Sequence, residues 1–209
     1  MPRNKEIKLE IKSDRLLLVE GKDEVNLFTA LIKHCFSNEI DIQIIDAGGI
    51  YNILRNLKAI REIVRTLPNF QSIGVVRDAD DNSENAFISI CNNLEKAEYH
   101  PPQSHGTFSN NSPSVGVFIM PNGTSKGSIE TLCWQSVKDL PAAKCVEQYL
   151  ECLENNNTMN SKNKDKSFAH AYLASMQNPV ARVGEGALQG AWKFDSPAFK
   201  ELIKFIRDL

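Results

Sequence analysis

Short apolar runs alternate with helical periodicity over roughly the first 140 residues of the chain. An unbroken apolar run of about four to eight residues is typical of a strand covered on both faces, and apolar positions about three or four residues apart are typical of a helix. The clearest helical spacing runs from Ile53 to Leu67 and ends before Pro68. The predicted strands are 16–19, 40–46, 72–76 and 115–120, and the predicted helices between them are 23–36, 53–67 and 83–97. This alternation favours an α/β fold with a mostly parallel four-stranded sheet flanked by helices.

Residues with short polar side chains mark the expected beginnings of several helices, because their oxygens accept hydrogen bonds from free backbone N–H groups. Asp23 is predicted to cap the first helix and Ser83 the third. A short helix is predicted to begin near Ser128, and Ser196 followed by Pro197 predicts the start of the last one.

After about residue 140 the pattern contains only helical signals. The polar stretch 155–166 is predicted to be a linker, and the glycine-rich stretch 184–190 is predicted to be a loop that interrupts helix. We therefore expect an α/β domain over residues 1–140 and a C-terminal helical extension over residues 141–209 that packs on it.

Composition and charge narrow the class of protein. The chain has 209 residues, is 42% hydrophobic and carries 24 Lys and Arg against 26 Asp and Glu. That composition excludes a disordered or fibrous chain, and the near-neutral charge favours neither membranes nor nucleic acid as a whole-molecule partner, although a local basic groove remains compatible with it. No apolar run is long enough for a membrane span and the first residues lack a signal peptide, so we expect a cytoplasmic protein. The five cysteines include no CxxC pair and are predicted to be reduced core thiols.

Carboxylates gather where the predicted strands end. They are Glu20, Glu24, Asp78, Asp80 and Glu130. Glu24 follows Glu20 by one helical turn, and Asp78 and Asp80 share one side of an extended segment. Because ligands of open α/β sheets lie beyond the carboxyl ends of the strands, we expect these side chains to meet at one rim.

Carboxylates that cluster raise one another's pKa unless a cation lies among them. Oxygen ligands select Mg²⁺, Mn²⁺ or Ca²⁺ over zinc, and one Mg²⁺ takes only one or two carboxylates. Two ions about 3.5–4 Å apart would use the whole set, an arrangement that serves phosphoryl transfer. The alternative interpretation is an acidic surface without a ligand, which the placement of all five at strand ends disfavours.

The runs LLLVEGKDE and IGVVRDADD resemble the Toprim domain of primases, topoisomerases and several nucleases. Glu20 and Gly21 match the glutamate and glycine that follow its first strand, and Asp78 and Asp80 match its later DxD. The resemblance covers residues 14 to about 137, so the expected domain over 1–140 is a Toprim domain. It implies a Rossmann-like sheet.

The sequence is most similar to the OLD (overcoming lysogenization defect) nucleases and their small stand-alone relatives. Glu20 and Glu24 match their ExxxE, and Ser128 and Glu130 match their SxE element. These nucleases also bring a lysine from a C-terminal helix to the site, for which Lys166 is the first candidate here and Lys164 the second. The chain lacks the GxxxxGK[ST] motif of their ATPase domain, so a partner protein is expected to supply any further function.

The resemblance implies a metal-dependent nuclease with Mg²⁺ as cofactor and Mn²⁺ or Ca²⁺ as its substitutes. Glu20, Asp78 and Asp80 are expected to hold one ion. Glu24 and Glu130, supported by Ser128, are expected to hold the second.

Lys166 is expected to offset charge on the reacting phosphate, so the catalytic set is Glu20, Asp78, Asp80 and Lys166. Gly21, Gly48 and Lys164 are candidates for binding the substrate, although Gly48 is also predicted simply to make the turn after the second strand. DNA is favoured over RNA as the partner. A non-catalytic Toprim binding module and nucleotidyl transfer as in primases are the alternatives.

Overall fold

A parallel sheet of four strands forms the centre of the molecule in the computed structural model, which describes residues 9–37, 39–159, 161 and 163–209. The strands are β1 (Arg15–Val19), β2 (Gln43–Asp46), β3 (Ser72–Asp78) and β4 (Ser114–Met120). Their order in the sheet is β2-β1-β3-β4, and every neighbouring pair is parallel. The predicted fold class is therefore confirmed, and the sheet is consistent with the Rossmann-like arrangement that the Toprim resemblance implies.

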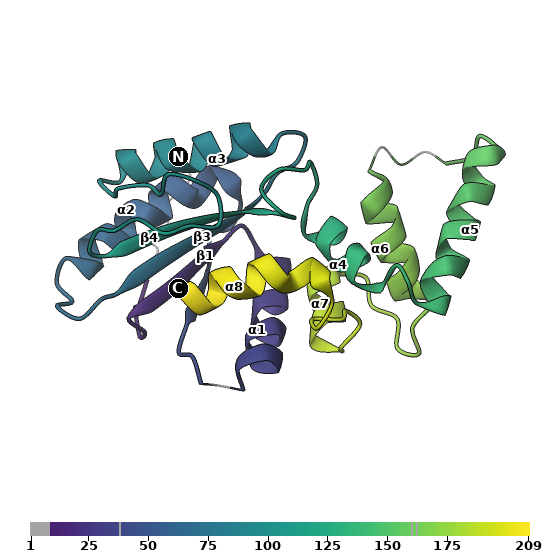
Figure 1. Ribbon diagram of the computed structural model, residues 1–209, viewed down its shortest axis with the longest axis horizontal. Helices are drawn as coiled ribbons and strands as arrows, with labels where there is room; N and C mark the ends of the chain where they lie inside the picture. Colours follow the sequence, from purple (N-terminus) through teal and green to yellow (C-terminus); the bar gives the residue numbers. More distant parts are fainter. Residues whose placement is uncertain (1–8, 38, 160, 162) are drawn as a thin grey trace, which may run out of the picture.

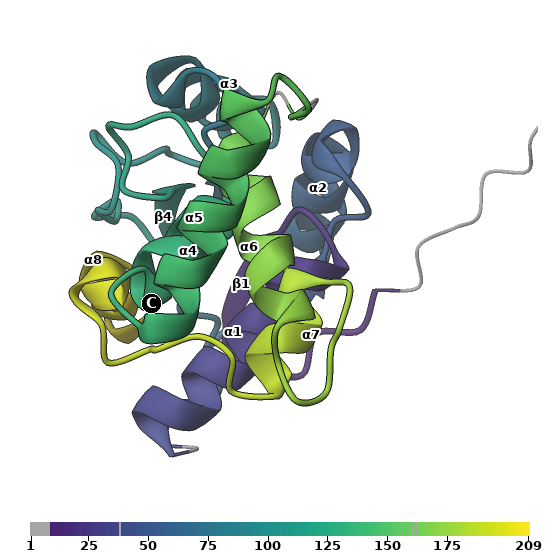
Figure 2. The same cartoon turned by 90° about the vertical axis from the view of Figure 1, so that its right-hand side faces the viewer.

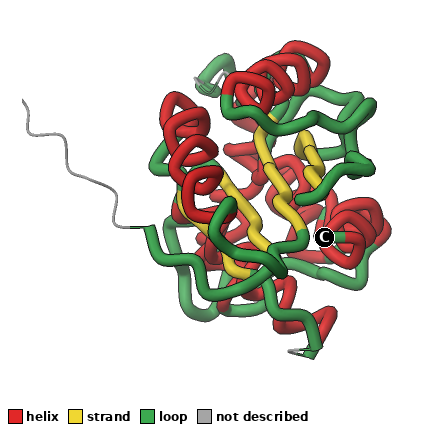
Figure 3. Tube along the Cα trace, turned by 90° about the vertical axis from the view of Figure 1, so that its left-hand side faces the viewer, coloured by secondary structure: helices red, strands yellow, loops and turns green. Residues whose placement is uncertain are grey.

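Helices cover both faces of this sheet (Figure 1), which explains why the strands are apolar on both sides. Leu16 and Leu18 of β1 face a core shared with α2 (Ile53–Val64) and α3 (Ser83–Lys96). Leu17 and Val19 face the other core, which includes α1 (Lys22–Phe36) and α8 (Lys200–Asp208). Figure 3 looks at the sheet from the amino ends of its strands and shows it between the two helical layers.

The C-terminal helix α8 lies directly on the sheet. The side chains of Phe205 and Leu209 surround Gly74 of β3, where an added Cβ would lie 3.2 Å from each of them. The Ser72 hydroxyl donates a hydrogen bond to the Leu209 carbonyl. Because the core is continuous across residue 140, the division of the chain into two domains stays a prediction.

Three helices stand beyond the carboxyl ends of the strands, and Figure 2 views the molecule from this side. They are α4 (Ile129–Val137), α5 (Pro141–Asn155) and α6 (Lys164–Ala174). Trp134 of α4 stacks on Phe168 of α6 with 4.7 Å between the ring centroids. The prediction of a linker over 155–166 is wrong at both ends, because Asn155 is the last residue of α5 and residues 164–166 form the first turn of α6. The Asn163 side chain accepts a hydrogen bond from the Lys166 amide there. Positions 160 and 162 of that stretch lie outside the described residues.

The glycine-rich stretch predicted to be a loop forms a helix, α7 (Val183–Leu188). Its Gly184 packs against α1 so closely that a Cβ would lie 2.4 Å from the Asp23 carbonyl oxygen. Glycine therefore permits a close contact between helices here and does not break one. The Asp23 carboxylate accepts a hydrogen bond from the Gly184 amide at 3.1 Å, so the prediction that Asp23 caps α1 is also wrong.

The observed ends of the other helices differ from the predictions in detail. Asn82 caps α3 by accepting a hydrogen bond from the Asn85 amide, so the prediction of Ser83 as the cap is off by one residue. The predicted start of a short helix near Ser128 is confirmed, because α4 begins at Ile129. The cap predicted at Ser196 is also confirmed; a 3-10 turn, η2 (Pro197–Phe199), lies between Ser196 and α8. A second 3-10 turn, η1 (Ile50–Asn52), precedes α2, which ends at Val64.

All five cysteines are free thiols, but only Cys133 is fully buried, and Cys145 and Cys152 are exposed. Their prediction as core thiols is thus wrong for two of them, which lie on the outer surface of α5. Within the described residues, no helix combines the length and the apolar character that crossing a membrane requires.

Candidate acidic site at the carboxyl edge of the sheet

The strand order reverses between β1 and β3, because the chain leaves β1 toward β2 on one side and returns to β3 on the other. Loops diverge at such a point and leave a crevice beyond the strand ends, where open α/β sheets bind ligands. Glu20 directly follows β1, and Asp78 ends β3. The Glu20 Oε1 atom accepts a hydrogen bond from the Asp78 amide at 3.1 Å, so the structure brings these two predicted residues together at that point.

Asp78 occupies the centre of the acidic cluster. Its Oδ1 atom accepts a hydrogen bond at 2.9 Å from the amide of Ile129, the first residue of α4. Burial raises the pKa of Asp78 well above its ordinary value, and neighbouring negative charges raise this pKa further. Those charges belong to Glu20, Glu24, Glu130 and Asp80. The four other carboxylates that the sequence predicts to meet therefore all lie close enough to Asp78 to raise its pKa.

The two glutamates of the ExxxE pair both have raised pKa values. Glu24 is 7% exposed, and its pKa is raised first by burial and then by the charge of Glu20, although a hydrogen bond of 3.1 Å from the Gly21 amide opposes this shift. Burial also raises the pKa of Glu20, against the opposing effects of the Asp78 amide and of Arg77. The Arg77 Nε atom lies 3.9 Å from Glu20 Oε1. Arg77 is a member of the site that motif analysis missed, although it directly precedes Asp78.

Asp80 is exposed and adopts a positive φ of 51°, a conformation that Asp tolerates better than most residues. Its backbone forms a two-way bridge with Gly127, with N···O distances of 2.9 and 2.8 Å. This bridge ties the loop after β4 to the end of β3. It thereby positions Gly127 directly before Ser128, where α4 and the SxE element begin.

The SxE element and the predicted lysine also meet in the structure. The Ser128 hydroxyl donates a hydrogen bond of 2.6 Å to Glu130 Oε2, so Ser128 orients this buried carboxylate. The Lys166 Nζ atom lies 3.4 Å from Glu130 Oε1. Lys164 instead pairs with Glu154 on α5. Of the two candidate lysines, Lys166 is therefore the one that contacts the cluster.

A hydrogen bond between helices, which sequence analysis missed, holds Lys166 in that position. The Thr131 hydroxyl donates to Asp165 Oδ2 at 2.7 Å and accepts from the Ser128 amide at 3.2 Å. It thus links the first turn of α4 to the first turn of α6. The spacing Ser128-x-x-Thr131 resembles a capping box and could have indicated the second bond. Nothing local indicates the first, since Asp165 lies in the stretch interpreted as a linker.

The remaining candidates form the loops around the cluster. Gly48 makes the predicted turn after β2, and its amide donates to Asp46 Oδ1 at 2.7 Å. The next amide, that of Gly49, donates to the Glu20 carbonyl at 2.7 Å. The amide of Gly21 is taken by Glu24, as described above. Substrate binding by Gly21 and Gly48 stays a prediction.

The donor chemistry fits a hard divalent cation. All candidate ligands are oxygens, and the carboxylates outnumber the two cationic side chains that approach them within 4 Å among the described residues, Arg77 and Lys166. Burial is the main cause of the raised pKa of Asp78, and a divalent ion would relieve the repulsion that adds to it. Each carboxylate of the cluster except that of Asp80 accepts a hydrogen bond. In the described part of the chain, no three His, Cys, Asp or Glu side chains are arranged as a metal-binding group.

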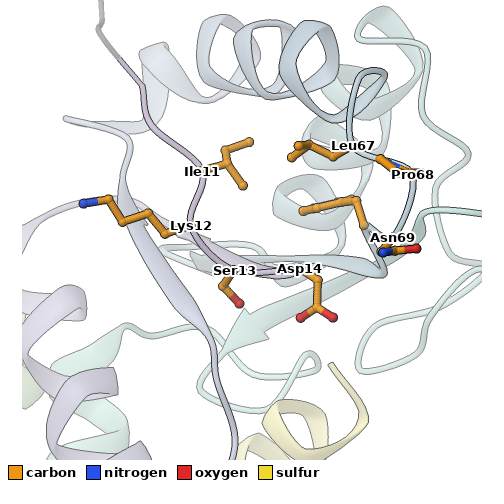
Figure 4. Close-up of a pocket in the computed structure, with 8 residues that line it drawn as sticks. Ile11, Lys12, Ser13, Asp14, Leu67, Pro68 and Asn69 are labelled. Atoms are coloured by element: carbon orange, nitrogen blue, oxygen red, sulfur yellow. The ribbon is translucent and has the colours of Figure 1, made fainter.

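A separate pocket opens at the opposite edge of the sheet. Figure 4 shows its lining, formed by residues 11–14 before β1 and residues 67–70 before β3, around a volume of about 250 Å³. It lies at the amino ends of the strands, so it is not part of the acidic site.

Fold and site together define an α/β protein with an acidic centre at the switch point of a parallel sheet. The chain belongs to the family described as "Protein of unknown function (DUF3226)", whose sequence profile matches residues 14–209. The match extends from the first residues before β1 to the end of α8 and so includes Lys166 with the carboxylates. No curated protein and no solved structure matches the chain.

Proposed function

We propose that this protein is a metal-dependent nuclease that hydrolyses phosphodiester bonds, with DNA favoured over RNA as its substrate. The observation that carries the proposal is the set of contacts at the switch point, where Glu20 accepts a hydrogen bond from the Asp78 amide at 3.1 Å and Lys166 lies 3.4 Å from Glu130. Glu24, Asp80 and Glu130 lie close enough to Asp78 for their charges to raise its pKa beyond the effect of burial. The Toprim-like and OLD-like sequence runs support the same activity, because their characteristic residues are the ones that converge.

In this proposal the carboxylates hold Mg²⁺, with Mn²⁺ or Ca²⁺ as possible substitutes. Glu20, Asp78 and Asp80 would hold one ion, and Glu24 and Glu130 a second. Ions bound at such sites activate water and stabilise the charge of a phosphate undergoing in-line displacement. The protein contributes the orientation of the ligands: Ser128 fixes Glu130, and the Ile129 amide fixes Asp78.

Lys166 supplies positive charge for the reacting phosphate. Its side chain is 51% exposed, so its ammonium group can reach a substrate while it stays next to Glu130. A cation placed where charge develops stabilises the transition state more than the ground state. Arg77 has a different task, because it is largely buried and offsets the charge of Glu20.

The test is the variant Asp78→Asn, which keeps an oxygen to accept the hydrogen bond from Ile129 and removes the charge. We expect it to lose cleavage of plasmid and oligonucleotide DNA by a factor of about 10² or more while it remains folded. Asp208→Asn, at an exposed position of α8, is the matched control and should cut like the parent. Mn²⁺ binding by calorimetry, with and without the substitution, reports on the site independently of cleavage.

Three results would contradict the proposal in different ways. If Asp78→Asn cuts as fast as the parent in Mg²⁺, the acidic cluster is not the catalytic site. If the parent binds DNA in a metal-dependent manner and forms no product, the non-catalytic binding module replaces the nuclease. If it incorporates labelled nucleotides, nucleotidyl transfer replaces hydrolysis.

A further inference from the structure

Tyr51 is an aromatic side chain displayed on a constrained loop next to the acidic site. Its side chain is 98% exposed, whereas Trp134, Trp192 and Phe28 are buried. It lies in η1, which follows β2 at the same carboxyl edge that carries the carboxylates. Its neighbour Ile50 packs against the core under α2, so the loop is anchored while the tyrosine faces solvent.

Hydrogen bonds hold this loop in one conformation and link it to the site. Gly48 and Gly49 have φ values of 71° and 106°, which residues with a side chain rarely adopt. The Gly49 amide binds the Glu20 carbonyl, and the side chain of buried Asn56 donates to the Ala47 carbonyl at 3.1 Å. The backbone of Tyr51 is therefore positioned two residues from a direct contact with the main chain of Glu20, so binding a ligand would cost mainly the rotamer freedom of its side chain.

A cationic side chain accompanies the tyrosine. Arg55 follows Tyr51 by about one helical turn, at the start of α2, and is exposed. Within the described part of the chain it forms no ion pair with an acidic side chain, unlike Arg65, which pairs with Glu62 and Glu98. An aromatic ring and a free guanidinium about one turn apart can contact a base and a phosphate of the same strand.

We propose that Tyr51 and Arg55 bind an unpaired stretch of the nucleic acid substrate, with a base stacked on the Tyr51 ring and a phosphate on Arg55. The inference rests on the proposed nuclease function and names its substrate class: single-stranded nucleic acid, or a single-stranded portion of a duplex. A base inside a duplex is covered on both faces by its neighbours and cannot stack on the ring. A stacking contact also supplies affinity to a protein whose net charge is −2.

The experiment measures binding of a single-stranded oligonucleotide containing 2-aminopurine to the full chain in chelator, where the proposed cleavage is silent. Stacking on a protein aromatic is worth ~1–3 kcal/mol per base, so Tyr51→Ala should weaken binding roughly 5- to 150-fold and abolish the quenching of 2-aminopurine fluorescence. Tyr51→Phe should retain both. Arg55→Ala should lower the dependence of log K on log salt by ~0.7, the amount expected for one phosphate contact to a single strand.

Two controls make the result specific. Tyr149→Ala, which removes another exposed tyrosine, 57% exposed on α5, should bind like the parent. The same oligonucleotide annealed to its complement should bind the parent and Tyr51→Ala equally. The inference is overturned if Tyr51→Ala binds the single strand like the parent, if it weakens duplex binding by the same factor, or if sedimentation shows that it dissociates an oligomer.

Cleavage in Mg²⁺ separates this inference from the proposed function. If the parent cuts DNA and Tyr51→Ala cuts single strands equally well, only the inference about Tyr51 fails. If the parent cuts no nucleic acid but binds single strands through Tyr51, the nuclease proposal fails and the strand-binding contact stands. If the parent neither binds nor cuts, both are overturned.

Discussion

Charged side chains are arranged differently at the amino and carboxyl edges of the sheet. At the amino edge, charged groups are satisfied by partners: Arg65 pairs with Glu62 and Glu98, and Gln71 links Arg15 to Asp14. At the carboxyl edge, burial raises the pKa of Asp78, and the neighbouring carboxylates raise it further. Holding like charges together in partial burial costs free energy. The contrast teaches that charge at the amino edge is paired, whereas among the described residues of the carboxyl edge the carboxylates outnumber the cations beside them, as the proposed metal site requires.

The largest expected effect is on the cleavage rate, and it distinguishes two lysines on the first turn of α6. Lys166 contacts Glu130 and Lys164 contacts Glu154, so only the first belongs to the carboxyl-edge site. Lys166→Ala should reduce the cleavage rate at saturating Mg²⁺ by a factor of about 10²–10³. Lys164→Ala should stay within about twofold of the parent. Equal losses in the two variants would mean that the α6 lysines act as a diffuse positive charge.

The next effect concerns Thr131, which holds α6 against α4. Thr131→Val removes the hydroxyl that binds Asp165, and loss of a hydrogen bond to a charged group costs about 1.5–3 kcal/mol. We expect the cleavage rate to fall by about tenfold or more as Lys166 loses its position, with recovery in Thr131→Ser. Hydrogen exchange at the α6 amides should rise in the valine variant. Unchanged exchange together with a lowered rate would assign Thr131 a direct contact with the substrate.

The pH dependence of the free energy of unfolding tests whether the pKa values of the acidic cluster are raised. The pKa values of Asp78, Glu20 and Glu24 are raised above their ordinary 3.8, 4.5 and 4.5, so the protonated carboxyls favour the folded state. In chelator, this contribution to the free energy of unfolding is complete below the ordinary pKa values and is lost as pH rises through the raised ones. Urea unfolding across that range should show the decline.

The same measurement with Mg²⁺ provides the comparison. Bound cation favours the ionised carboxylates, so the decline should disappear or reverse. Asp78→Asn should be less sensitive to pH in chelator than the parent. If the free energy of unfolding of the parent changes with neither pH nor Mg²⁺, the proposal that these carboxylates bind a cation is contradicted.

The smallest effect is expected at the amino edge. Arg65 and its two partners are substantially exposed, and such ion pairs contribute about 0–1 kcal/mol. Arg65→Ala should therefore change the free energy of unfolding by less than ~1 kcal/mol and leave cleavage unchanged. An effect on cleavage here would show that the two edges are coupled through the sheet.

Features that depend on neighbouring residues were predictable from the sequence, and features that depend on packing between distant segments were not. Apolar runs located all four strands, and their alternation with helices brought Glu20 and Asp78 to one edge. Gly184 was misinterpreted because its close contact, the Asp23 backbone, lies 161 residues away. Thr131 and Asp165 were missed for the same reason, since only the folded chain brings α4 and α6 together.

The contact between Gly184 and Asp23 has a consequence for variants that are truncated after residue 140. Asp23 directly precedes Glu24, so the segment after residue 140 braces the helix that carries half of the ExxxE pair. The same segment delivers Lys166 and Asp165. An isolated N-terminal fragment would retain four strands and every carboxylate of the cluster. It would lose the contacts of Gly184, Asp165 and Lys166 that position those carboxylates.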